Sequence, residues 1–519
     1  MVKGRRKFIM RNFGSLIREK ALKHQNKTLF IFRDGEISFK DFHEKTSRMA
    51  ASLVGYGLNI SDRVIVHFGN GLEIVESYFA VGKAGAISIP LNTMFTAREM
   101  KYIINNAEAK FIITSEDSLA KILSIRDEIP TVQKIFVAGK GRQSDVIPYR
   151  QLYEGTTQEV HGLDVDPESI SMVFYTSGTT GNPKGAMLTH NGLITNAEVM
   201  VKTLGFTEND RSLCILPFFH LFATMFSLLQ MMFAGGSTVI VEGKFDEEIA
   251  CRFIEKYKVT VLLGVPTIFI YLINYPGRKK YDLSSLRIGV TGSGPVPITL
   301  KEQFEKEVGI VVVEGYGLTE GGPIVCIERP GGERRLGSCG LTLPGLETRV
   351  VDQNGKDVPP GEIGELIIKG YPYIMKGYWK MPKETSETLR NGWLFTGDLV
   401  KKDKDGYIYI VDRIKDMIVR GGYNIYPKEV EMVLYSHPSV LETAVVGIFD
   451  EVLGEVPKAY IVLKPGENIS VEELNKYCRE NLAAYKVPRE IVLVNELPKT
   501  GSGKISKVEI REREKMKGN

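Results

Sequence analysis

Short apolar runs alternate with longer amphipathic patterns over the first three hundred residues of the chain. The runs 64–70 (VIVHFGN) and 109–115 (AKFIITS) predict buried strands, while 73–86 (EIVESYFAVGKAGA) has the apolar spacing of a helix. Strands that alternate with helices indicate parallel sheets covered on both faces. We therefore expect two successive α/β units, over about residues 28–160 and 168–320.

The pattern changes in the last third of the chain. Short strands and turns between about 335 and 411 predict an antiparallel β unit, and a small α+β unit follows Arg413. The predicted fold class is α/β, with a large N-terminal domain of parallel α/β sheets plus the antiparallel unit, and a small α+β C-terminal domain. The charged stretch DRIKD is a plausible linker, which gives domains at 1–412 and 417–519 joined by 413–416.

One loop concentrates the chemistry of the first domain. The apolar run 170–174 leads into Tyr175-Thr-Ser-Gly-Thr-Thr-Gly-Asn-Pro-Lys-Gly185, and a helical pattern starts at His190. Glycines let backbone N–H groups approach oxyanions, and the hydroxyls and Lys184 add donors and charge. The spacing is not that of a Walker P-loop. A flexible surface loop is less favoured because the loop directly follows a buried strand.

This loop closely resembles the signature of the acyl-adenylate-forming superfamily, which contains acyl-CoA synthetases, firefly-type luciferases and the adenylation domains of peptide synthetases. Further motifs follow in the family's order, so the resemblance covers nearly the whole chain. It implies ATP, Mg²⁺ and coenzyme A as cofactor and co-substrates. It also implies that part of the loop binds ATP and that Thr180 ligates magnesium. The implied ATP-binding residues of the loop are Thr176, Ser177, Gly178, Thr179, Thr180 and Lys184.

Two motifs that follow strands resemble the family's adenine site. Gly315-Tyr-Gly-Leu-Thr-Glu320 implies that Tyr316 stacks on adenine, that Thr319 contacts the α-phosphate region and that Glu320 ligates Mg²⁺, a cation that prefers hard oxygen ligands. A glycine-rich loop that ends in a solvated glutamate is the alternative. The segment 292–294 resembles the small-residue wall of the pocket, with a serine where family members more often have alanine. The implied ATP-binding residues here are Gly292, Ser293, Gly294, Gly315, Tyr316 and Gly317.

Later motifs imply the ribose site and the joint between the domains. Trp393-Leu-Phe-Thr-Gly-Asp398 resembles the ribose motif, in which Asp398 accepts both ribose hydroxyls. Asp412 and Arg413 add a second ribose contact by the same resemblance. Lys415 stands where the family has its hinge residue, although any residue of this charged linker could absorb a rotation. The small domain is accordingly expected to be mobile.

Three further elements are assigned catalytic or binding roles by resemblance. Lys504, in a Gly/Ser loop near the C-terminus, implies the lysine that reaches the active site during adenylation; without the motif it would count as a solvated lysine. His220, in the apolar run LPFFHLF, either gates the carboxylate or is an ordinary core histidine. Gly421 and Gly422 resemble the loop that lines the pantetheine tunnel for coenzyme A.

Composition narrows the setting. The 519 residues carry a net charge of only +4, which gives no indication of a nucleic-acid partner. Five scattered cysteines favour a reducing cytoplasm and argue against a zinc site. Residues 212–241 hold no fixed charge, but Pro217, His220 and the Gly235-Gly236 pair interrupt them, so a buried helix and strand beside an apolar pocket is preferred to a membrane span.

The N-terminus is strongly basic. It either contacts anionic membrane lipid or is a solvated arm, and no apolar core of a signal peptide follows it. Whether the chain forms a homodimer is left open by the sequence. The basic residues are Lys3, Arg5, Arg6, Lys7 and Arg11.

We interpret the chain as a soluble, cytoplasmic acyl-CoA synthetase. It converts a carboxylic acid and Mg·ATP to acyl-AMP and pyrophosphate, and then transfers the acyl group to coenzyme A. A medium- or long-chain fatty acid is the first choice of substrate, with a coumarate- or benzoate-type aromatic acid as the alternative. A carrier-protein-loading domain, a luciferase-like oxygenase and a nucleotide-binding relative without activity are less favoured. The expected apolar pocket lining is Phe218, Phe219, Phe222, Met225 and Phe226.

Overall fold

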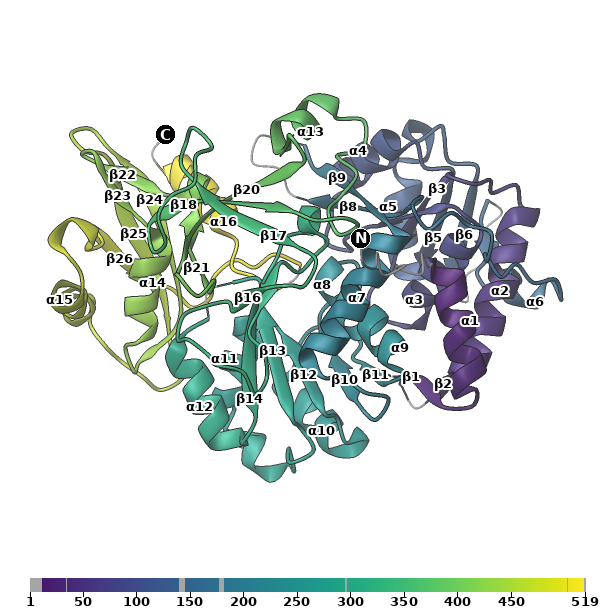
Figure 1. Ribbon diagram of the computed structural model, residues 1–519, viewed down its shortest axis with the longest axis horizontal. Coiled ribbons are helices and arrows are strands. Elements are labelled where there is room, and N and C mark those ends of the chain that lie inside the picture. The colour runs from purple at the N-terminus through teal and green to yellow at the C-terminus, as the bar shows by residue number, and fades with distance from the viewer. Residues whose placement is uncertain are drawn as a thin grey trace, which may run out of the picture.

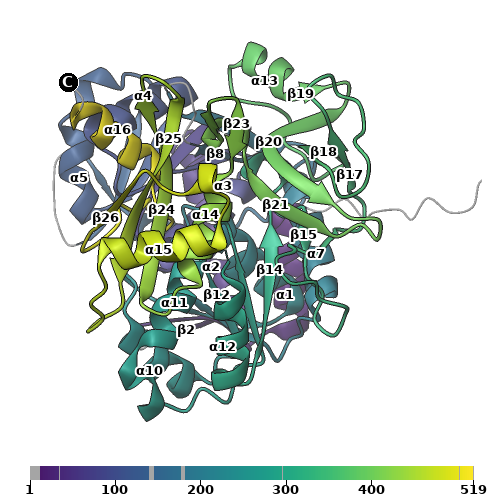
Figure 2. The same ribbon diagram turned by 90° about the vertical axis from the view of Figure 1, so that its left-hand side faces the viewer.

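The computed structural model describes residues 12–33, 35–139, 145–176, 182–294, 296–501 and 503–517. Two large sheets, an antiparallel unit and a small C-terminal domain make up the molecule, and the small domain lies at one end of it (Figure 1). Figure 2 shows the small domain facing the viewer, in front of the larger part of the chain. The five basic residues of the N-terminal arm lie outside the described residues.

The first large sheet has seven strands, and all of its pairings are parallel except the last, between β8 and β9. Both of its faces are covered, as the burial of β3 shows. Val64 and Val66 point into one apolar cluster and Ile65 into another, because successive strand residues face opposite sides. In sheet order the strands are β7 (Ile147–Pro148), β6 (Lys134–Ala138), β5 (Phe111–Ser115), β3 (Arg63–His67), β4 (Ile87–Pro90), β8 (Ile170–Thr176) and β9 (Lys184–Thr189).

The second large sheet has nine strands, with a parallel centre and antiparallel strands at both edges. Helices α10 (Glu247–Tyr257), α11 (Pro266–Asn274) and α12 (Ile298–Val308) belong to its crossovers and lie beside it in Figure 1. In sheet order the strands are β16 (Leu341–Thr342), β15 (Cys326–Ile327), β14 (Val311–Tyr316), β13 (Ile288–Gly292), β12 (Val261–Gly264), β10 (Arg211–Cys214), β11 (Ser237–Ile240), β1 (Thr28–Phe32) and β2 (Gly35–Ser38).

The predicted strands and helices of both units are present, but the two sheets do not follow the predicted division of the chain. Strand β1 pairs with β11 of the second sheet, and β8 pairs with β4 of the first. The division at about residue 160 was therefore wrong as a description of the sheets. Alternation of strands and helices indicates a parallel sheet, but it carries no information about which sheet a strand joins.

The main apolar core lies between the two sheets and contains residues of both. Helix α3 (Leu72–Lys83) packs there against α1 (Phe13–His24) and α2 (Phe39–Gly55), and its residues from Ile74 onward are all buried. The buried carboxylate of Glu76 has partners in this core: it accepts hydrogen bonds from Lys45 at 2.7 Å and from the Tyr149 hydroxyl at 2.9 Å. Burying a carboxylate in this way is tolerable only with such partners.

The antiparallel unit predicted for residues 335–411 is present as a five-stranded sheet. Its last strand, β21, reaches to the predicted linker, and α13 (Pro382–Thr388) connects two parts of the unit. Strand β16, by contrast, joins the nine-stranded sheet. The five strands are β17 (Glu347–Val351), β18 (Ile363–Lys369), β19 (Leu389–Arg390), β20 (Trp393–Lys402) and β21 (Ile408–Arg413).

The small domain has its own sheet and its own apolar core. The predicted fold class is confirmed, and the predicted helices and strands of this domain are all found. A short hairpin and the last helix were not predicted from the sequence. The elements are β22 (Ile418–Arg420), β23 (Tyr423–Ile425), α14 (Pro427–Tyr435), β24 (Val440–Asp450), β25 (Gly454–Leu463), α15 (Val471–Asn481), β26 (Glu490–Leu493) and α16 (Lys507–Lys517).

The uncharged stretch 212–241 folds into short pieces, as its prolines and glycines predict. After β10 come α8 (Leu221–Ala223), the π-helical segment η2 (Thr224–Gln230), α9 (Met231–Ala234) and β11. No helix in the described part of the chain is long and apolar enough to cross a membrane. Four of the five expected pocket residues are buried in the main core, and Phe222 alone of them is partly exposed, stacked on Phe226.

A substitution at Phe218 tests whether this side chain belongs to the core or to the acid pocket. Its side chain is fully buried in the main cluster, so we expect Phe218→Ala to lower the free energy of unfolding by about 3–5 kcal/mol. Phe449→Ala is the matched control, because that ring is 82% exposed and its loss should change stability by less than about 0.5 kcal/mol. Urea unfolding of both variants measures this, and equal stabilities would contradict the placement of Phe218 in the core.

Candidate active site

The glycine-rich loop connects two antiparallel strands. Thr176, the last residue of β8, pairs with Lys184, the first residue of β9. Strand β9 was not predicted, and it separates the loop from helix α7 (His190–Leu204) by six residues. The helix N-terminus therefore does not follow the loop directly, and the side chain of Thr189 caps it at 3.0 Å from the Gly192 N–H. Four of the predicted ATP-binding residues lie outside the described residues: Ser177, Gly178, Thr179 and Thr180.

Glu320 lies beside the end of this loop. It belongs to the short 3-10 turn Thr319–Gly321, and its Oε1 atom accepts hydrogen bonds from the Tyr378 hydroxyl at 2.9 Å and from the Thr176 hydroxyl at 3.4 Å. The Lys184 ammonium lies 5.3 Å from the centre of the Tyr378 ring. The tertiary structure thus brings Thr176, Lys184, Thr319 and Glu320 together.

Tyr378 is a site residue that the sequence reasoning missed. It contacts both Glu320 and Lys184, and burial together with the Glu320 charge raises its pKa, so that its hydroxyl stays a donor. The surrounding sequence, KGYWK, contains no motif that the resemblance used. The one available signal was a tyrosine next to a tryptophan in an otherwise polar segment, which is too weak to identify a site.

The residues around Glu320 fit a magnesium ion. Mg²⁺ is commonly held by one or two carboxylates together with water and substrate phosphates, and Glu320 and the Thr176 hydroxyl supply hard oxygen atoms of that kind. In the part of the chain that the structure describes, no group of three or more His, Cys, Asp or Glu side chains could hold a metal alone. A magnesium ion held by Glu320 and Thr176 would take further ligands from water and substrate phosphates.

The buried carboxylate of Asp398 contacts two other predicted nucleotide-binding residues. Asp398 is only 4% exposed; its Oδ2 accepts a hydrogen bond from the Tyr316 hydroxyl at 2.5 Å and its Oδ1 lies 3.2 Å from Arg413 Nε. Burial raises the pKa of Asp398, and the charge of Arg413 opposes this rise. Tyr316, Asp398 and Arg413 come from β14, β20 and β21. One carboxylate therefore connects the nine-stranded sheet with the antiparallel unit at the linker.

The glycines of the adenine motifs permit close backbone approach. A Cβ atom at Gly292 would clash with the carbonyl oxygen of Gly315, and one at Gly317 would clash with that of Pro323. Ser293 adopts a φ of 69°, in the left-handed region that usually favours glycine. The ends of β13 and β14 can therefore form a tight wall of small residues, with Gly294 following Ser293 in the loop.

The carboxylate of Asp412 is bonded to backbone N–H groups. Its Oδ2 accepts a hydrogen bond from the Lys428 backbone N–H at 2.8 Å, and its Oδ1 accepts one from the Arg413 N–H at 2.8 Å. Both bonds bind the carboxylate to backbone at the linker and at the start of α14. The expected second ribose contact of Asp412 stays a prediction, and the Arg413 side chain reaches Asp398.

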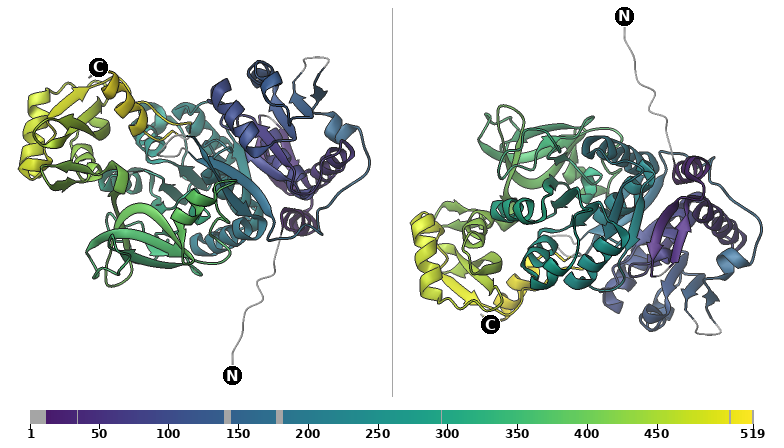
Figure 3. Two further views of the ribbon diagram at one scale, coloured as in Figure 1. Left: turned by 90° about the horizontal axis from the view of Figure 1, so that it is seen from above. Right: turned by 90° about the horizontal axis from the view of Figure 1, so that it is seen from below.

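Lys504 is carried from the small domain into the large one. Figure 3 shows the C-terminal segment, in yellow, extending from the small domain across to the large domain. The Thr267 hydroxyl of α11 donates a hydrogen bond to the carbonyl of Gly503 at 3.2 Å. Burial and the nearby Arg413 lower the pKa of Lys504 to about 8.

His220 lies close enough to Lys504 for the charge of the lysine to lower the pKa of the imidazole. Burial first, and then the Lys504 ammonium, lower the pKa of His220 to about 3, so the imidazole is neutral at physiological pH. Its Nε2 atom is buried and has no hydrogen-bond partner among the described residues. A neutral ring beside a cation can orient a carboxylate without adding charge, and it is also compatible with a core histidine.

The predicted hinge residue and the predicted coenzyme A loop lie in two separate turns of the chain. Lys415 sits in the 3-10 turn Ile414–Asp416, between β21 of the antiparallel sheet and β22 of the small domain. Burial lowers the pKa of Lys415, and Arg413 lowers it further. Gly421 and Gly422 form the exposed turn of the β22–β23 hairpin, with φ values of 54° and 86°. In this orientation the Lys504 loop is docked and the glycine turn faces solvent.

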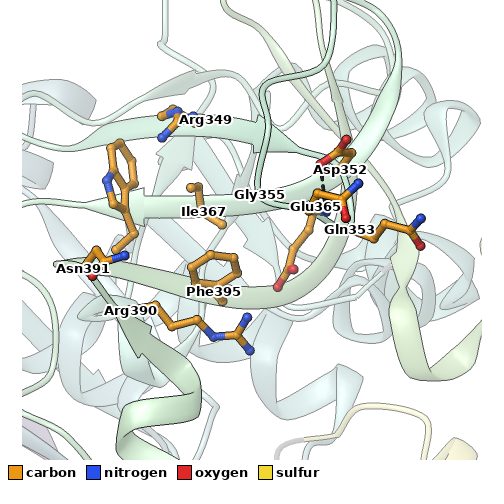
Figure 4. Close-up of a pocket in the computed structure, with 11 residues that line it drawn as sticks. Arg349, Asp352, Gln353, Gly355, Glu365, Ile367, Arg390, Asn391 and Phe395 are labelled. Carbon is orange, nitrogen blue, oxygen red and sulfur yellow. Dashed lines mark hydrogen bonds between the residues drawn. The ribbon is translucent and has the colours of Figure 1, made fainter.

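A separate hollow of 450 Å³ lies on the antiparallel unit (Figure 4). Arg349, Arg390 and Phe395 line it, together with Glu365, whose Oε1 accepts a hydrogen bond from the Gly397 N–H at 2.9 Å. None of the predicted nucleotide-binding residues lines this hollow.

Comparison with known proteins agrees with this geometry. The model of the AMP-binding enzyme family matches residues 17–379, and that of the AMP-binding enzyme C-terminal domain matches residues 429–504. A long-chain-fatty-acid–CoA ligase of Bacillus subtilis is 36% identical over 96% of this chain and 94% of its own. A feruloyl-CoA synthase of Amycolatopsis sp is 36% identical over 92% of this chain and 94% of its own.

Solved structures give the same result. The crystal structure of an anthranilate CoA ligase in complex with anthranoyl-AMP superposes with a TM-score of 0.93 at 31% identity, over 98% of each chain. The fold and the site define an adenylate-forming enzyme with a mixed α/β large domain and a smaller C-terminal domain. The chain belongs to the AMP-binding enzyme family, and it is an ATP-dependent acyl-CoA synthetase that uses ATP, Mg²⁺ and coenzyme A.

The pKa of Lys504 gives the first step a defined pH dependence. The lysine is a cation below a pH of about 8 and loses its charge above it. We therefore expect kcat/KM for ATP in adenylate formation, which reports groups of the free enzyme, to fall as the pH rises through about 8. Lys504→Arg keeps the charge and should remove the fall, at a lower rate overall. Pyrophosphate exchange between pH 6.5 and 9.5 measures both, and a fall that persists in the arginine variant would assign it to another group.

Proposed function

We propose that this synthetase activates medium- or long-chain fatty acids, and that its small domain serves the two half-reactions in two orientations. The single observation that carries the two-orientation part is the position of Lys504. It is docked beside His220 and Arg413 while the Gly421–Gly422 turn, on the same small domain, is exposed. Both elements cannot occupy the site at once if they lie on different faces of one rigid domain.

The first half-reaction brings two anions together. A carboxylate oxygen attacks the α-phosphorus of ATP, the bond to the pyrophosphate oxygen breaks, and acyl-AMP forms. Lys504 and Lys184 are the cations that can approach the reacting oxygens, and Lys504 suits the role because its ammonium is compact and mobile. Bound magnesium supplies charge neutralisation on the phosphates, with Glu320 and Thr176 as the residues that would hold it.

The nucleoside is held by the groups around Asp398. The ring of Tyr316 would stack on adenine while its hydroxyl fixes the Asp398 carboxylate at 2.5 Å, and Asp398 would accept from the ribose hydroxyls. Gly292, Ser293, Gly294, Gly315 and Gly317 would form the adenine wall. Arg413 would add a cation at the same carboxylate, from the edge of the linker.

The second half-reaction needs a thiol at the acyl carbonyl in place of Lys504. The sulfur of coenzyme A attacks the carbonyl carbon of acyl-AMP, and AMP leaves. A turn about Lys415 would withdraw Lys504 and bring the Gly421–Gly422 turn to the tunnel. Glycines at positive φ suit such a turn because the backbone can approach a thin pantetheine chain without a side chain in the way.

A fatty acid is supported by the segment after His220, where no residue carries a fixed charge as far as Val241. The partly exposed Phe222 would be the member of the expected lining that contacts the acid, because its four companions are packed into the core. The Bacillus subtilis relative is named for long-chain fatty acids. The feruloyl-CoA synthase and anthranilate ligase relatives favour an aromatic acid as the second candidate.

The two orientations predict separable half-reactions. Lys504→Ala should slow adenylate formation by roughly 10²–10³, the typical effect of losing a preorganised charge in the transition state. It should convert supplied acyl-AMP and coenzyme A to thioester at a near wild-type rate. Lys415→Pro, which fixes φ at the linker, should show the reverse pattern where that φ suits the docked orientation. An equal loss of both half-reactions in Lys504→Ala would contradict the two-orientation proposal.

The choice of acid has its own test. Each methylene buried in an apolar pocket gains about 0.8 kcal/mol, so the apparent affinity should rise roughly three- to fourfold per CH₂ until the pocket is full. Pyrophosphate exchange with a series of acids from C4 to C18, with ferulate, benzoate and anthranilate beside them, measures this. A flat response along the aliphatic series with strong use of an aromatic acid would replace the fatty-acid proposal by the second candidate.

A further inference from the structure

The loop that carries Lys504 begins with a second lysine, Lys499, which the nucleotide site does not use. Lys499 and Ile505 form an antiparallel bridge that closes the loop. Inside it the Thr500 N–H donates to the carbonyl of Lys504 at 2.7 Å, and the Gly503 N–H donates to that of Thr500 at 2.9 Å. The position of Lys504 is therefore tied through a short, bonded turn to the position of Lys499.

The Lys499 ammonium connects the two domains. Its Nζ lies 2.8 Å from Oε1 of Glu442 on β24 of the small domain. The same Nζ donates to the hydroxyl of Tyr271 on α11 of the large domain at 3.0 Å and lies 4.6 Å from the centre of that ring. One cation thus holds a carboxylate of its own domain and a tyrosine of the other.

The charge of Glu442 determines where the Lys499 ammonium lies. Glu442 is completely buried, and a buried carboxylate needs a cation, so it fixes the Lys499 side chain from within the small domain. Burial would lower the pKa of Lys499, but the contacts with Glu442 and Tyr271 outweigh it and raise that pKa. The lysine therefore remains a cation and presents its remaining N–H groups to the half-buried Tyr271.

The neighbouring contacts between this loop and the large domain are weaker, because they involve no charged group. The bond from the Thr267 hydroxyl to the Gly503 carbonyl joins two neutral groups, and Gly501 packs closely against the Asn92 side chain. Hydrogen bonds with an ionised donor are roughly twice as strong as neutral ones. Glu442 and Lys499 would move together if the small domain turned, whereas Tyr271 would stay behind. The energy of the Lys499–Tyr271 contact consequently belongs to the docked orientation alone.

We propose that Lys499 and Tyr271 form a latch that selects the adenylate-forming orientation of the small domain, with Glu442 as the group that aims the lysine. All three are positioning residues that act through Lys504. This inference rests on the two-orientation proposal above. The latch predicts that its loss lowers the population in which Lys504 is docked, and so slows only the half-reaction that needs Lys504.

The central experiment is Tyr271→Phe, because it removes one hydroxyl and leaves no buried charge without a partner. Losing a hydrogen bond to a charged group should slow acid-dependent pyrophosphate exchange about tenfold. The rate at which supplied acyl-AMP and coenzyme A give thioester should stay the same or rise. Lys499→Met combined with Glu442→Gln removes the whole latch without leaving Glu442 charged, and should slow exchange further, again with an intact second half-reaction. Lys499→Arg keeps the cation, so its pyrophosphate exchange rate should be higher than that of the double variant.

Lys458→Met is the matched control. Lys458 also pairs with carboxylates of the small domain, at 2.7 Å from Glu514 and 2.6 Å from Glu490, and these described contacts do not reach the large domain. We expect it to change the two half-reactions by the same factor, through stability alone. The latch is overturned if Tyr271→Phe leaves both half-reactions unchanged or lowers both equally, as the control does. Loss of both half-reactions in Lys504→Ala would instead overturn the two-orientation proposal, so the two failures are distinguishable.

Discussion

The carboxylate of Asp398 is the interaction on which the arrangement of the site depends. It is almost fully buried, and it is acceptable there because the Tyr316 hydroxyl and the Arg413 guanidinium satisfy it. Tyr316 belongs to β14 of the nine-stranded sheet, and Arg413 belongs to β21, the strand that leads into the linker. One carboxyl group therefore fixes the antiparallel unit against the nine-stranded sheet, at the place where the small domain begins.

Charge repulsion follows from the same arrangement. Arg413 and Lys504 are both cations, and the pKa of Lys504 falls to about 8 through burial and through this neighbour. Docking the Lys504 loop is thus opposed by its own electrostatics until an anionic nucleotide is bound. The Lys499–Tyr271 contact lies on the same loop and acts in the opposite direction. In the proposed second orientation, Glu442 would still compensate the charge of Lys499.

Much of the site could be inferred from the sequence because its residues stand in continuous motifs. Tyr316, Glu320, Asp398 and Arg413 fall in such motifs, and the structure brings them around one region. Tyr378 could not be inferred, since it reaches Glu320 from a segment that carries no motif of its own. The bonds from the Arg413 and Lys428 backbone N–H groups to Asp412 could not be inferred either, since no motif records them.

The sequence by itself determined the elements of the fold, because apolar periodicity reports burial along each strand and helix. It also determined the reaction class, because catalytic groups close together in the chain leave a readable motif. Only the tertiary structure decided that β1 and β8 belong to opposite sheets, that β9 follows the glycine-rich loop, and that Lys499 meets Tyr271. These features depend on contacts between residues far apart in the chain, and local periodicity carries no record of such partners.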